Sequence, residues 1–186
     1  MSRTRNIVLI SLTVALTTAG AYLRIPVGPV PISLQTLFVL LAGALLGPWL
    51  GSLAMISYIT LGLVGLPLFT GGGGPQYILS PTFGFLLSFP LSAAIVGFLL
   101  NPAGAVKSPG TVRRLGAMAL GSLVIYLVGI PWLALNLLFI QGKQLGLGAL
   151  LSMGMLPFLP GDALKVLLAS WLVGPVQRAL GQAPRA

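Results

Sequence analysis

The stretch from residue 34 to residue 66, LQTLFVLLAGALLGPWLGSLAMISYITLGLVGL, decides the fold of this 186-residue chain. It carries no charged side chain and consists of two apolar runs, Leu34–Gly47 and Trp49–Leu66, that meet at Gly47-Pro48. A helix is expected to break there, because proline has no backbone N–H donor and glycine permits a turn. The stretch therefore predicts two antiparallel membrane helices with almost no loop between them.

Four more apolar runs approach the length of a membrane span, which needs about 20 mainly apolar residues. The six predicted spans are residues 7–23, 34–47, 49–66, 83–100, 115–140 and 163–176. Pro131 is expected to kink or end the fifth span. The segment 145–158 is apolar but short, which is typical of a re-entrant or interfacial segment. We therefore predict an all-α integral membrane protein, with one transmembrane domain over residues 1–186 and six helices in a compact bundle.

The cationic side chains predict the orientation of the spans, because cytoplasmic loops carry an excess of Lys and Arg. With both termini inside, seven cations face the cytoplasm and three face outward: Arg3, Arg5, Lys107, Arg113, Arg114, Arg178 and Arg185 inside, and Arg24, Lys143 and Lys165 outside. Treating residues 145–158 as a seventh span gives five against five. We therefore expect a multi-pass protein of the cell membrane with both termini in the cytoplasm.

The composition argues against a soluble domain and against most kinds of catalysis. Only 6% of the residues are charged, whereas soluble domains have about 25%. The chain has no His, no Cys and a single acidic residue, so it lacks the usual general base, a thiolate nucleophile and a carboxylate pair. We expect no enzyme activity, no cofactor and no metal site. A nucleic-acid partner is also not expected despite the net charge of +9, because little of the surface faces water.

The segment 67–81, PLFTGGGGPQYILSP, is expected to be a loop on the outer side, because four successive glycines and three prolines disfavour a helix. Gly71, Gly72, Gly73 and Gly74 do not form a nucleotide-binding loop, since no Gly-Lys-Ser/Thr follows them. Two interpretations stay open for this run. It is either a flexible connector, or a lid whose bare backbone approaches a small ligand closely.

Asp162, the only acidic residue, lies three positions before Lys165 in the sequence PGDALK at the start of the last span. On a helix these two side chains share a face. Asp162 either caps the helix, as an acid near an N-terminus commonly does, or contacts a ligand, as ionisable groups at membrane depth commonly do. Other polar residues that could converge on the same pocket are Gln35, Thr36, Tyr77, Thr82, Tyr126 and Asn136.

Ala15 and Ala19 form a small-xxx-small pair on the first span. Such pairs let two membrane helices approach closely. The pair is usually an internal packing seam, but on a lipid-facing surface it would be a docking site for another membrane protein.

Nearly the whole chain resembles the BioY family of biotin-binding S components of energy-coupling-factor transporters. The resemblance is carried by the combination of VPISLQT, GLVGLP, the glycine run, SPTFGF and the late LPFLPGDALKVLLA. It implies a six-helix S-component bundle that captures biotin from outside with high affinity. It also implies a transmembrane scaffold subunit and two ATP-binding subunits as partners in the lipid bilayer, with Ala15 and Ala19 as the scaffold docking site.

The sequence departs from the family pattern at two places. Ser33 replaces the threonine of VPxTLQT, and Thr82-Phe83-Gly84-Phe85 replaces the TGGY of PTGGY. The second change removes a tyrosine hydroxyl and with it one possible hydrogen bond to the ligand.

A biotin pocket should be largely apolar with a few placed polar groups. In the site that the resemblance implies, Asp162 accepts a ureido N–H and Lys165 is a charge partner for the ligand or for Asp162. Tyr77 and the backbone of Gly71–Gly74 form the lid, and Gln35, Thr36 and Thr82 complete the polar lining.

Three alternatives compete with this function. An S component for another vitamin and a stand-alone secondary carrier stay open as competing interpretations, although proton coupling usually uses several embedded carboxylates or histidines. A rhomboid-like intramembrane protease is disfavoured, because a chain without His has no Ser–His dyad.

Overall fold

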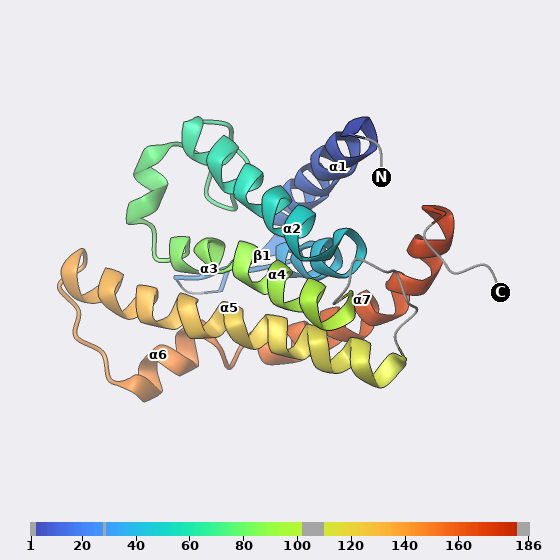
Figure 1. The fold of residues 1–186 in the computed structure, drawn as a ribbon. Coiled ribbons are helices and arrows are strands. Elements are labelled where there is room, and N and C mark those ends of the chain that lie inside the picture. Colours follow the sequence, from blue (N-terminus) through green and yellow to red (C-terminus); the bar gives the residue numbers. More distant parts are fainter. Residues whose placement is uncertain (1–2, 28, 102–109, 182–186) are drawn as a thin grey trace.

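A computed structural model describes residues 3–27, 29–101 and 110–181, which fold into a bundle of helices (Figure 1). The helices are α1 (Arg3–Tyr22), α2 (Gln35–Val64), η1, a 3-10 helix (Pro75–Leu79), α3 (Phe83–Leu87), α4 (Phe89–Leu100), α5 (Thr111–Phe139), α6 (Leu147–Gly154) and α7 (Leu159–Ala179). Two short strands, β1 (Arg24–Ile25) and β2 (Ile32–Ser33), pair antiparallel between α1 and α2.

Helix α2 is folded back on itself at Gly47. This residue has φ 77° and ψ −177°, a backbone conformation that interrupts the helix and that glycine adopts without strain. A Cβ atom placed on Gly51 would lie 2.9 Å from the carbonyl oxygen of Ala42, nine residues earlier in the chain. Such an approach is impossible in a straight helix, which rises about 1.5 Å per residue. Residues 35–46 and 48–64 are therefore two helical segments joined without a loop.

The folded α2 brings the number of crossing segments to six. Among the described residues, five helical stretches are long and apolar enough to cross a membrane, with α3 and α4 together counted as one, Phe83–Leu100. Because α2 contributes two segments, the bundle has six. The predicted fold class, an all-α membrane protein with six transmembrane helices, is confirmed. Large apolar side chains on the outside of the bundle, such as Trp49 (79% exposed) and Leu127 (64% exposed), fit contact with lipid.

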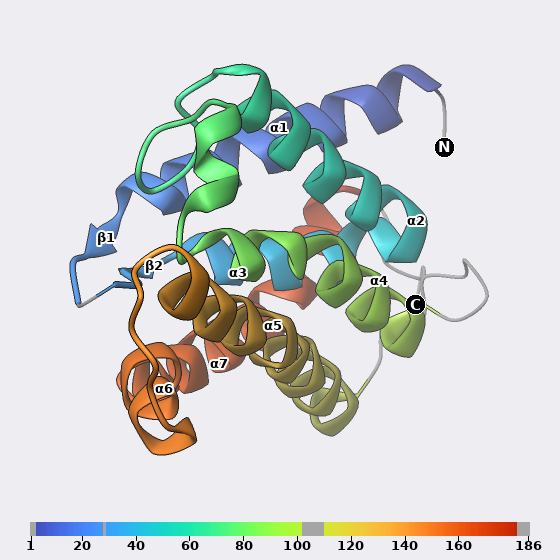
Figure 2. The same cartoon turned by 90° about the vertical axis from the view of Figure 1, so that its left-hand side faces the viewer.

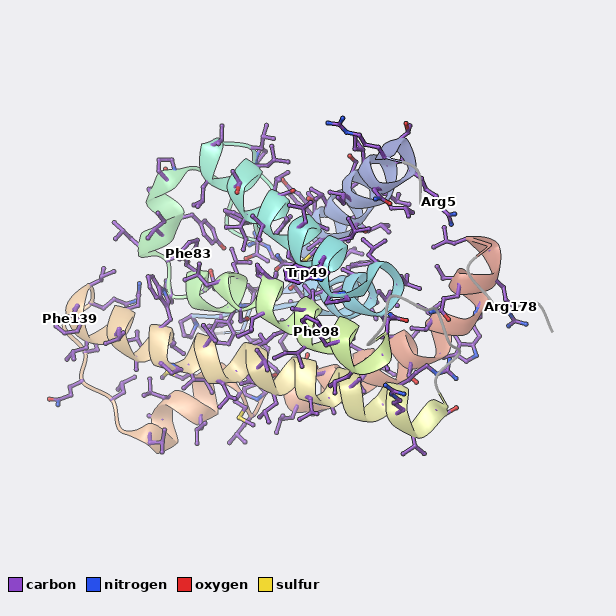
Figure 3. The ribbon with its side chains drawn as sticks, viewed as in Figure 1. Arg5, Trp49, Phe83, Phe98, Phe139 and Arg178 are labelled. Carbon is purple, nitrogen blue, oxygen red and sulfur yellow. The ribbon has the colours of Figure 1, made fainter. Side chains whose placement is uncertain are left out.

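The start of α1 and the end of α7 lie at one end of the bundle, here called the terminal end (Figures 1 and 3). The Arg5 guanidinium of α1 donates a hydrogen bond to the carbonyl of Leu180, which follows α7. Helix α5 also begins at this end, since Arg113 donates to the carbonyl of Leu99 near the end of α4 (2.7 Å). Phe139, at the other end of α5, marks the opposite end in Figure 3.

The opposite end, here called the hairpin end, carries the β1–β2 hairpin, η1 and α6 (Figure 2). Asn136 near the end of α5 donates to the carbonyl of Leu79 in η1 (2.7 Å), which fastens the loop after α2 to the bundle. The expectation that residues 67–81 contain no helix is wrong, because Pro75–Leu79 form η1. Pro75 is tolerated at the first position of η1, where its missing N–H has no partner to lose.

Proline ends neither α5 nor α7, so of the two alternatives for Pro131, a kink or an end of the helix, the end is excluded. Helix α5 continues through Pro131 to Phe139, and α7 continues through Pro175 to Ala179. In a membrane protein, neighbouring helices and local adjustments satisfy the backbone groups that a proline frees. The segment expected to be re-entrant or interfacial contains α6, a helix of 8 residues.

The core depends on close helix contacts at small residues. A Cβ on Gly43 of α2 would lie 2.3 Å from the carbonyl oxygen of Ala93 in α4, and one on Gly97 would lie 2.4 Å from the backbone nitrogen of Pro48. These contacts hold α4 against both segments of α2. Because α5 and α7 then pack against the same unit, the first segment of α2 is placed close to both of them.

Candidate functional site

A buried cavity, here called the central cavity, lies among α2, α5, α7 and the segments at the hairpin end. Most of its wall is apolar, and its polar groups come from all of these elements. The lining residues are Val30, Pro31, Ser33, Gln35, Thr36, Thr70, Tyr77, Thr82, Phe85, Leu86, Phe89, Ser122, Ile125, Tyr126, Phe158, Asp162 and Lys165. Its volume is about 60 Å³. Six of the ten residues predicted to bind substrate are therefore gathered here, from segments far apart in the sequence.

Asp162 and Lys165 form an ion pair in the wall of the central cavity. The Lys165 Nζ donates to Asp162 Oδ1 at 2.9 Å, and the two side chains are 7% and 14% exposed respectively. The other carboxylate oxygen, Oδ2, accepts a hydrogen bond from the Tyr126 hydroxyl of α5. The only acid of the chain therefore neutralises Lys165, the one cation among the described residues that line this cavity.

Asp162 is an acid of the first turn of α7, as one interpretation of the sequence expected, but it is not the N-cap of this helix. Helix α7 begins at Leu159, so Asp162 lies within its first turn, and the N-cap position is occupied by Phe158 without a side-chain cap. The hydrogen bonds of the carboxylate go to side chains of α5 and α7 and not to free backbone N–H groups. Its charge still lies at the favourable end of the helix dipole.

Gln35 is held by a chain of hydrogen bonds that runs along the α2 side of the cavity. Ser33 Oγ donates to Gln35 Oε1 (3.0 Å), and Gln35 Nε2 donates to the Tyr58 hydroxyl (2.7 Å). Tyr58 in turn donates to the carbonyl of Leu68 (2.8 Å). Because the side chains of Ser33, Gln35 and Tyr58 are linked by these hydrogen bonds, the amide of Gln35 has a defined orientation toward the cavity.

Thr36 differs from its neighbour, because its hydroxyl oxygen is buried and has no hydrogen-bond partner among the described residues. A buried polar group without a partner costs about 1 to 3 kcal/mol. Native proteins therefore rarely leave such a group unsatisfied. Because this residue lines the central cavity, the free hydroxyl is available to a bound molecule.

Hydroxyl groups also gather where the cavity meets the hairpin end. The Tyr77 hydroxyl lies 2.9 Å from Thr82 Oγ1 and 3.1 Å from Thr70 Oγ1. Thr82 Oγ1 is in addition 2.8 Å from Ser80 Oγ. Tyr77 and Thr82, both predicted from the sequence, thus belong to one network that closes the cavity toward this end.

The glycine run is not part of the central cavity. Gly71 and Gly73 instead line a neighbouring open groove of about 400 Å³, here called the outer groove. The described residues that line it are Arg24, Pro29, Pro31, Thr70, Gly71, Gly73, Gln76, Tyr77, Leu79, Ser80 and Thr82. Gly72 and Gly74 line neither space.

Backbone hydrogen bonds within and next to the glycine run hold it in place. The backbones of Phe69 and Gly72 pair through two hydrogen bonds (2.8 and 3.1 Å), and Gly74 N–H donates to the carbonyl of Gly62 at 2.7 Å. The run is therefore a fixed turn fastened to the end of α2. This overturns the interpretation of it as a flexible connector.

Sequence reasoning missed several lining residues of the central cavity and assigned to it five residues that do not line it, Asn136 and Gly71–Gly74. Thr70, Ser122, Phe89 and Phe158 had no signal, since each is ordinary in a membrane helix or loop, whereas Phe85 takes the place of the tyrosine in the family pattern PTGGY. Asn136 does not line the cavity, because its amide is used to hold η1. Tyr126 does line the cavity, although nothing in the sequence pairs it with Asp162.

Ala15 and Ala19 lie on the exposed side of α1. The opposite side of this helix, which includes Val14, Thr17 and Gly20, is buried. A Cβ on Gly20 would lie 2.9 Å from the backbone of Leu34, so the close contact of α1 with α2 is made there and not at the alanine pair. The pair is therefore not an internal packing seam.

The chemistry of the central cavity suits a small, mainly apolar molecule with a neutral polar head. Asp162 accepts hydrogen bonds, whereas Lys165, Tyr126 and Thr36 carry donors. The charge pair is balanced, so the cavity itself offers no net charge to a ligand. Phenylalanine and aliphatic side chains supply the apolar part of the wall.

Comparisons with known proteins agree with one another. A family model described as the BioY family matches residues 1–182. The protein named "Probable biotin transporter BioY" from Pyrococcus horikoshii is 39% identical over 168 residues, which cover 90% of this chain and 93% of that protein. A protein with the same name from Lysinibacillus sphaericus is 44% identical over 135 residues, which cover 72% of this chain and 67% of that protein.

A solved structure is similar over nearly the whole fold. It is described as the crystal structure, at 2.1 Å, of the S-component for biotin from an ECF-type ABC transporter. The TM-score is 0.83 and the sequence identity 30%, with 96% of this chain and 95% of that chain covered.

Proposed function

This chain belongs to the BioY family, and on that premise we propose that it is the biotin-binding S component of an energy-coupling-factor transporter. It binds biotin at the outer side of the cell membrane and delivers it for uptake. Its role is binding and transport, and no chemical step on the ligand is required of its side chains.

The observation that carries the proposal is the convergence of a balanced ion pair and an unpartnered hydroxyl on one apolar cavity. Biotin combines an apolar thioether ring with a neutral ureido group, which donates two N–H bonds and accepts at its carbonyl. Asp162 is the acceptor for a ureido N–H, and Lys165 is the charge partner of Asp162. Thr36, whose hydroxyl is otherwise unsatisfied, contacts the ligand beside Gln35.

The hydroxyl network of Tyr77 and Thr82 closes this site toward the hairpin end. Small-molecule pockets are commonly about 300 to 1,000 Å³, whereas the central cavity has about 60 Å³. Loading therefore requires the wall at the hairpin end to move outward. The segments that form this wall are the β1–β2 hairpin and the connection between α2 and α3, which carries Tyr77 in η1.

The test of the proposed function is saturable binding of labelled biotin to the purified protein, challenged with unlabelled biotin, thiamine or riboflavin. We expect only unlabelled biotin to compete. Competition by one of the other vitamins would assign the protein to that substrate instead, and the absence of saturable binding would contradict the proposal.

The proposed partners are a transmembrane scaffold subunit and two ATP-binding subunits. The sequence contains no nucleotide-binding loop of its own, so energy for uptake must come from outside the chain. The exposed small pair on α1 supports docking of a scaffold helix there, because small side chains let helices in lipid approach closely.

Replacing Ala15 and Ala19 with Trp is expected to block assembly with the scaffold and energised uptake while leaving biotin binding normal. The matched control is Leu123→Trp with Leu127→Trp, an exposed pair with the same spacing on α5, which should leave assembly intact. Co-purification of the subunits and biotin binding report the two effects separately. A loss of biotin binding together with assembly would make the alanine pair a structural feature, and uptake without any partner would favour a stand-alone carrier.

We propose that the hairpin end faces outward and that both termini are cytoplasmic. Among the described cations, Arg3, Arg5, Arg113, Arg114 and Arg178 belong to the terminal end, and Arg24, Lys143 and Lys165 to the hairpin end. Lys107 and Arg185 lie outside the described residues. The excess at the terminal end supports this orientation.

A cysteine-labelling experiment checks the orientation. In intact cells, Gln76→Cys in η1 should react with a membrane-impermeant thiol reagent, whereas Val112→Cys at the start of α5 should react only after permeabilisation. Both side chains are exposed, and the chain has no native cysteine. The reverse pattern of labelling would invert the proposed topology.

A further inference from the structure

The outer groove is an open space at the hairpin end, next to the central cavity. It shares Pro31, Thr70, Tyr77 and Thr82 with the central cavity, so these residues form the partition between the two spaces. The outer groove, at about 400 Å³, has the volume of a small-molecule pocket, and the central cavity, at about 60 Å³, does not. A ligand can therefore occupy the outer groove before the partition opens.

The two spaces differ in charge. In the central cavity, the charge of Lys165 is neutralised by Asp162. In the outer groove, Arg24 is the only charged side chain among the described residues of the lining. No carboxylate can neutralise it from within the chain, because the single acidic residue is Asp162 and this is already paired. The groove is thus electropositive.

The guanidinium of Arg24 has hydrogen-bonding capacity to spare. Arg24 is exposed, and it donates to the carbonyl of Thr70. A guanidinium has five N–H donors in a fixed fork. The donors that this one contact leaves unused can bind both oxygens of a carboxylate.

We propose that the outer groove is a capture subsite for the carboxylate of the incoming ligand, with Arg24 as the residue that binds it. The inference rests on the proposed function, since biotin is the anion in question. An uncompensated cation beside the route to a site raises the local concentration of an anionic ligand and so its association rate. Arg24 accordingly accelerates binding, whereas the contacts in the central cavity hold the bound ligand.

The test measures association and dissociation rates of labelled biotin and of the uncharged biotin amide on the full-length protein. Arg24→Gln retains a donor for the Thr70 carbonyl but removes the charge, and Arg24→Lys retains the charge. We expect Arg24→Gln to lower the association rate of biotin by about 5- to 10-fold at low salt and to leave the dissociation rate within about twofold. Arg24→Lys should recover most of the rate.

Two controls separate charge capture from other effects. Lys143→Gln removes another cation of the hairpin end that does not line the outer groove, and it should change the rate by less than about twofold. In about 1 M salt, where charges are screened beyond about 3 Å, the wild-type rate should fall to that of Arg24→Gln. Thermal unfolding of each variant verifies that it is folded.

The outcomes distinguish this inference from the proposed function. An equal loss of rate for biotin and biotin amide in Arg24→Gln would assign Arg24 to fastening the hairpin to the Thr70 loop and overturn the capture role. An unchanged rate for biotin would also overturn it. Wild-type protein that binds no biotin would instead contradict the proposed function itself.

Discussion

Asp162→Asn is expected to lower the affinity of the protein for biotin by about 10- to 100-fold. The substitution keeps the shape of the side chain but removes the charge that strengthens the hydrogen bond to a ureido N–H. It also leaves Lys165, whose side chain is 7% exposed, without its counter-ion. Removing one partner of a buried ion pair costs about 3 to 5 kcal/mol of stability. Affinity and thermal stability should therefore fall together in this variant.

The double variant Asp162→Asn with Lys165→Gln separates the two effects. Because it removes both charges, it should regain most of the thermal stability, as neutral replacements of buried pairs often do. Biotin affinity should stay low if Asp162 contacts the ligand. Recovery of affinity in the double variant would show that the ion pair only supports the fold.

Asn136→Leu provides a control for loss of a buried polar contact outside the cavity. Asn136 is 3% exposed and donates to Leu79 of η1, so its replacement should lower stability by about 1 kcal/mol. Affinity per folded molecule should remain normal. A drop in affinity of this variant as large as that of Asp162→Asn would mean that any local destabilisation weakens binding.

The parts of the molecule that the sequence predicted well depend on interactions between near neighbours. The break at Gly47 follows from the backbone preferences of two adjacent residues. The pairing of Asp162 with Lys165 follows from their spacing on one helix. The six apolar segments follow from composition over windows of about 20 residues. Each of these can be predicted without knowing how the helices pack.

The parts of the molecule that the sequence did not predict depend on contacts between distant segments. Tyr126 is 36 residues from Asp162 along the chain, and only the packing of α5 against α7 brings the two together. The alternative that Pro131 ends its helix is excluded only by the structure, in which α5 continues to Phe139. Which side of α1 is exposed depends on the contact between Gly20 and Leu34, which are distant enough in the sequence that no local pattern predicts it.

Gly73→Ala is expected to destabilise the protein by about 3 kcal/mol. A Cβ at this position would lie 2.1 Å from the carbonyl oxygen of Leu66 and 3.0 Å from that of Gly62. Both are backbone atoms at the end of α2 and cannot rotate away as a side chain would. For a chain of this length, such a loss lowers the unfolding temperature by about 6 to 12 °C, which thermal unfolding in detergent measures.

The measurement also decides what the glycine run does. Gly116→Ala in α5 is the matched control, since a Cβ there meets nothing within 4 Å and alanine is the better helix former; its stability should be unchanged or higher. If Gly73 only fixes the turn beside α2, the variant loses stability while its folded fraction binds biotin with near-normal affinity. A stable Gly73→Ala variant with strongly reduced affinity would instead place the Gly73 backbone in direct contact with the ligand, because a methyl group would then obstruct the ligand and not the helix.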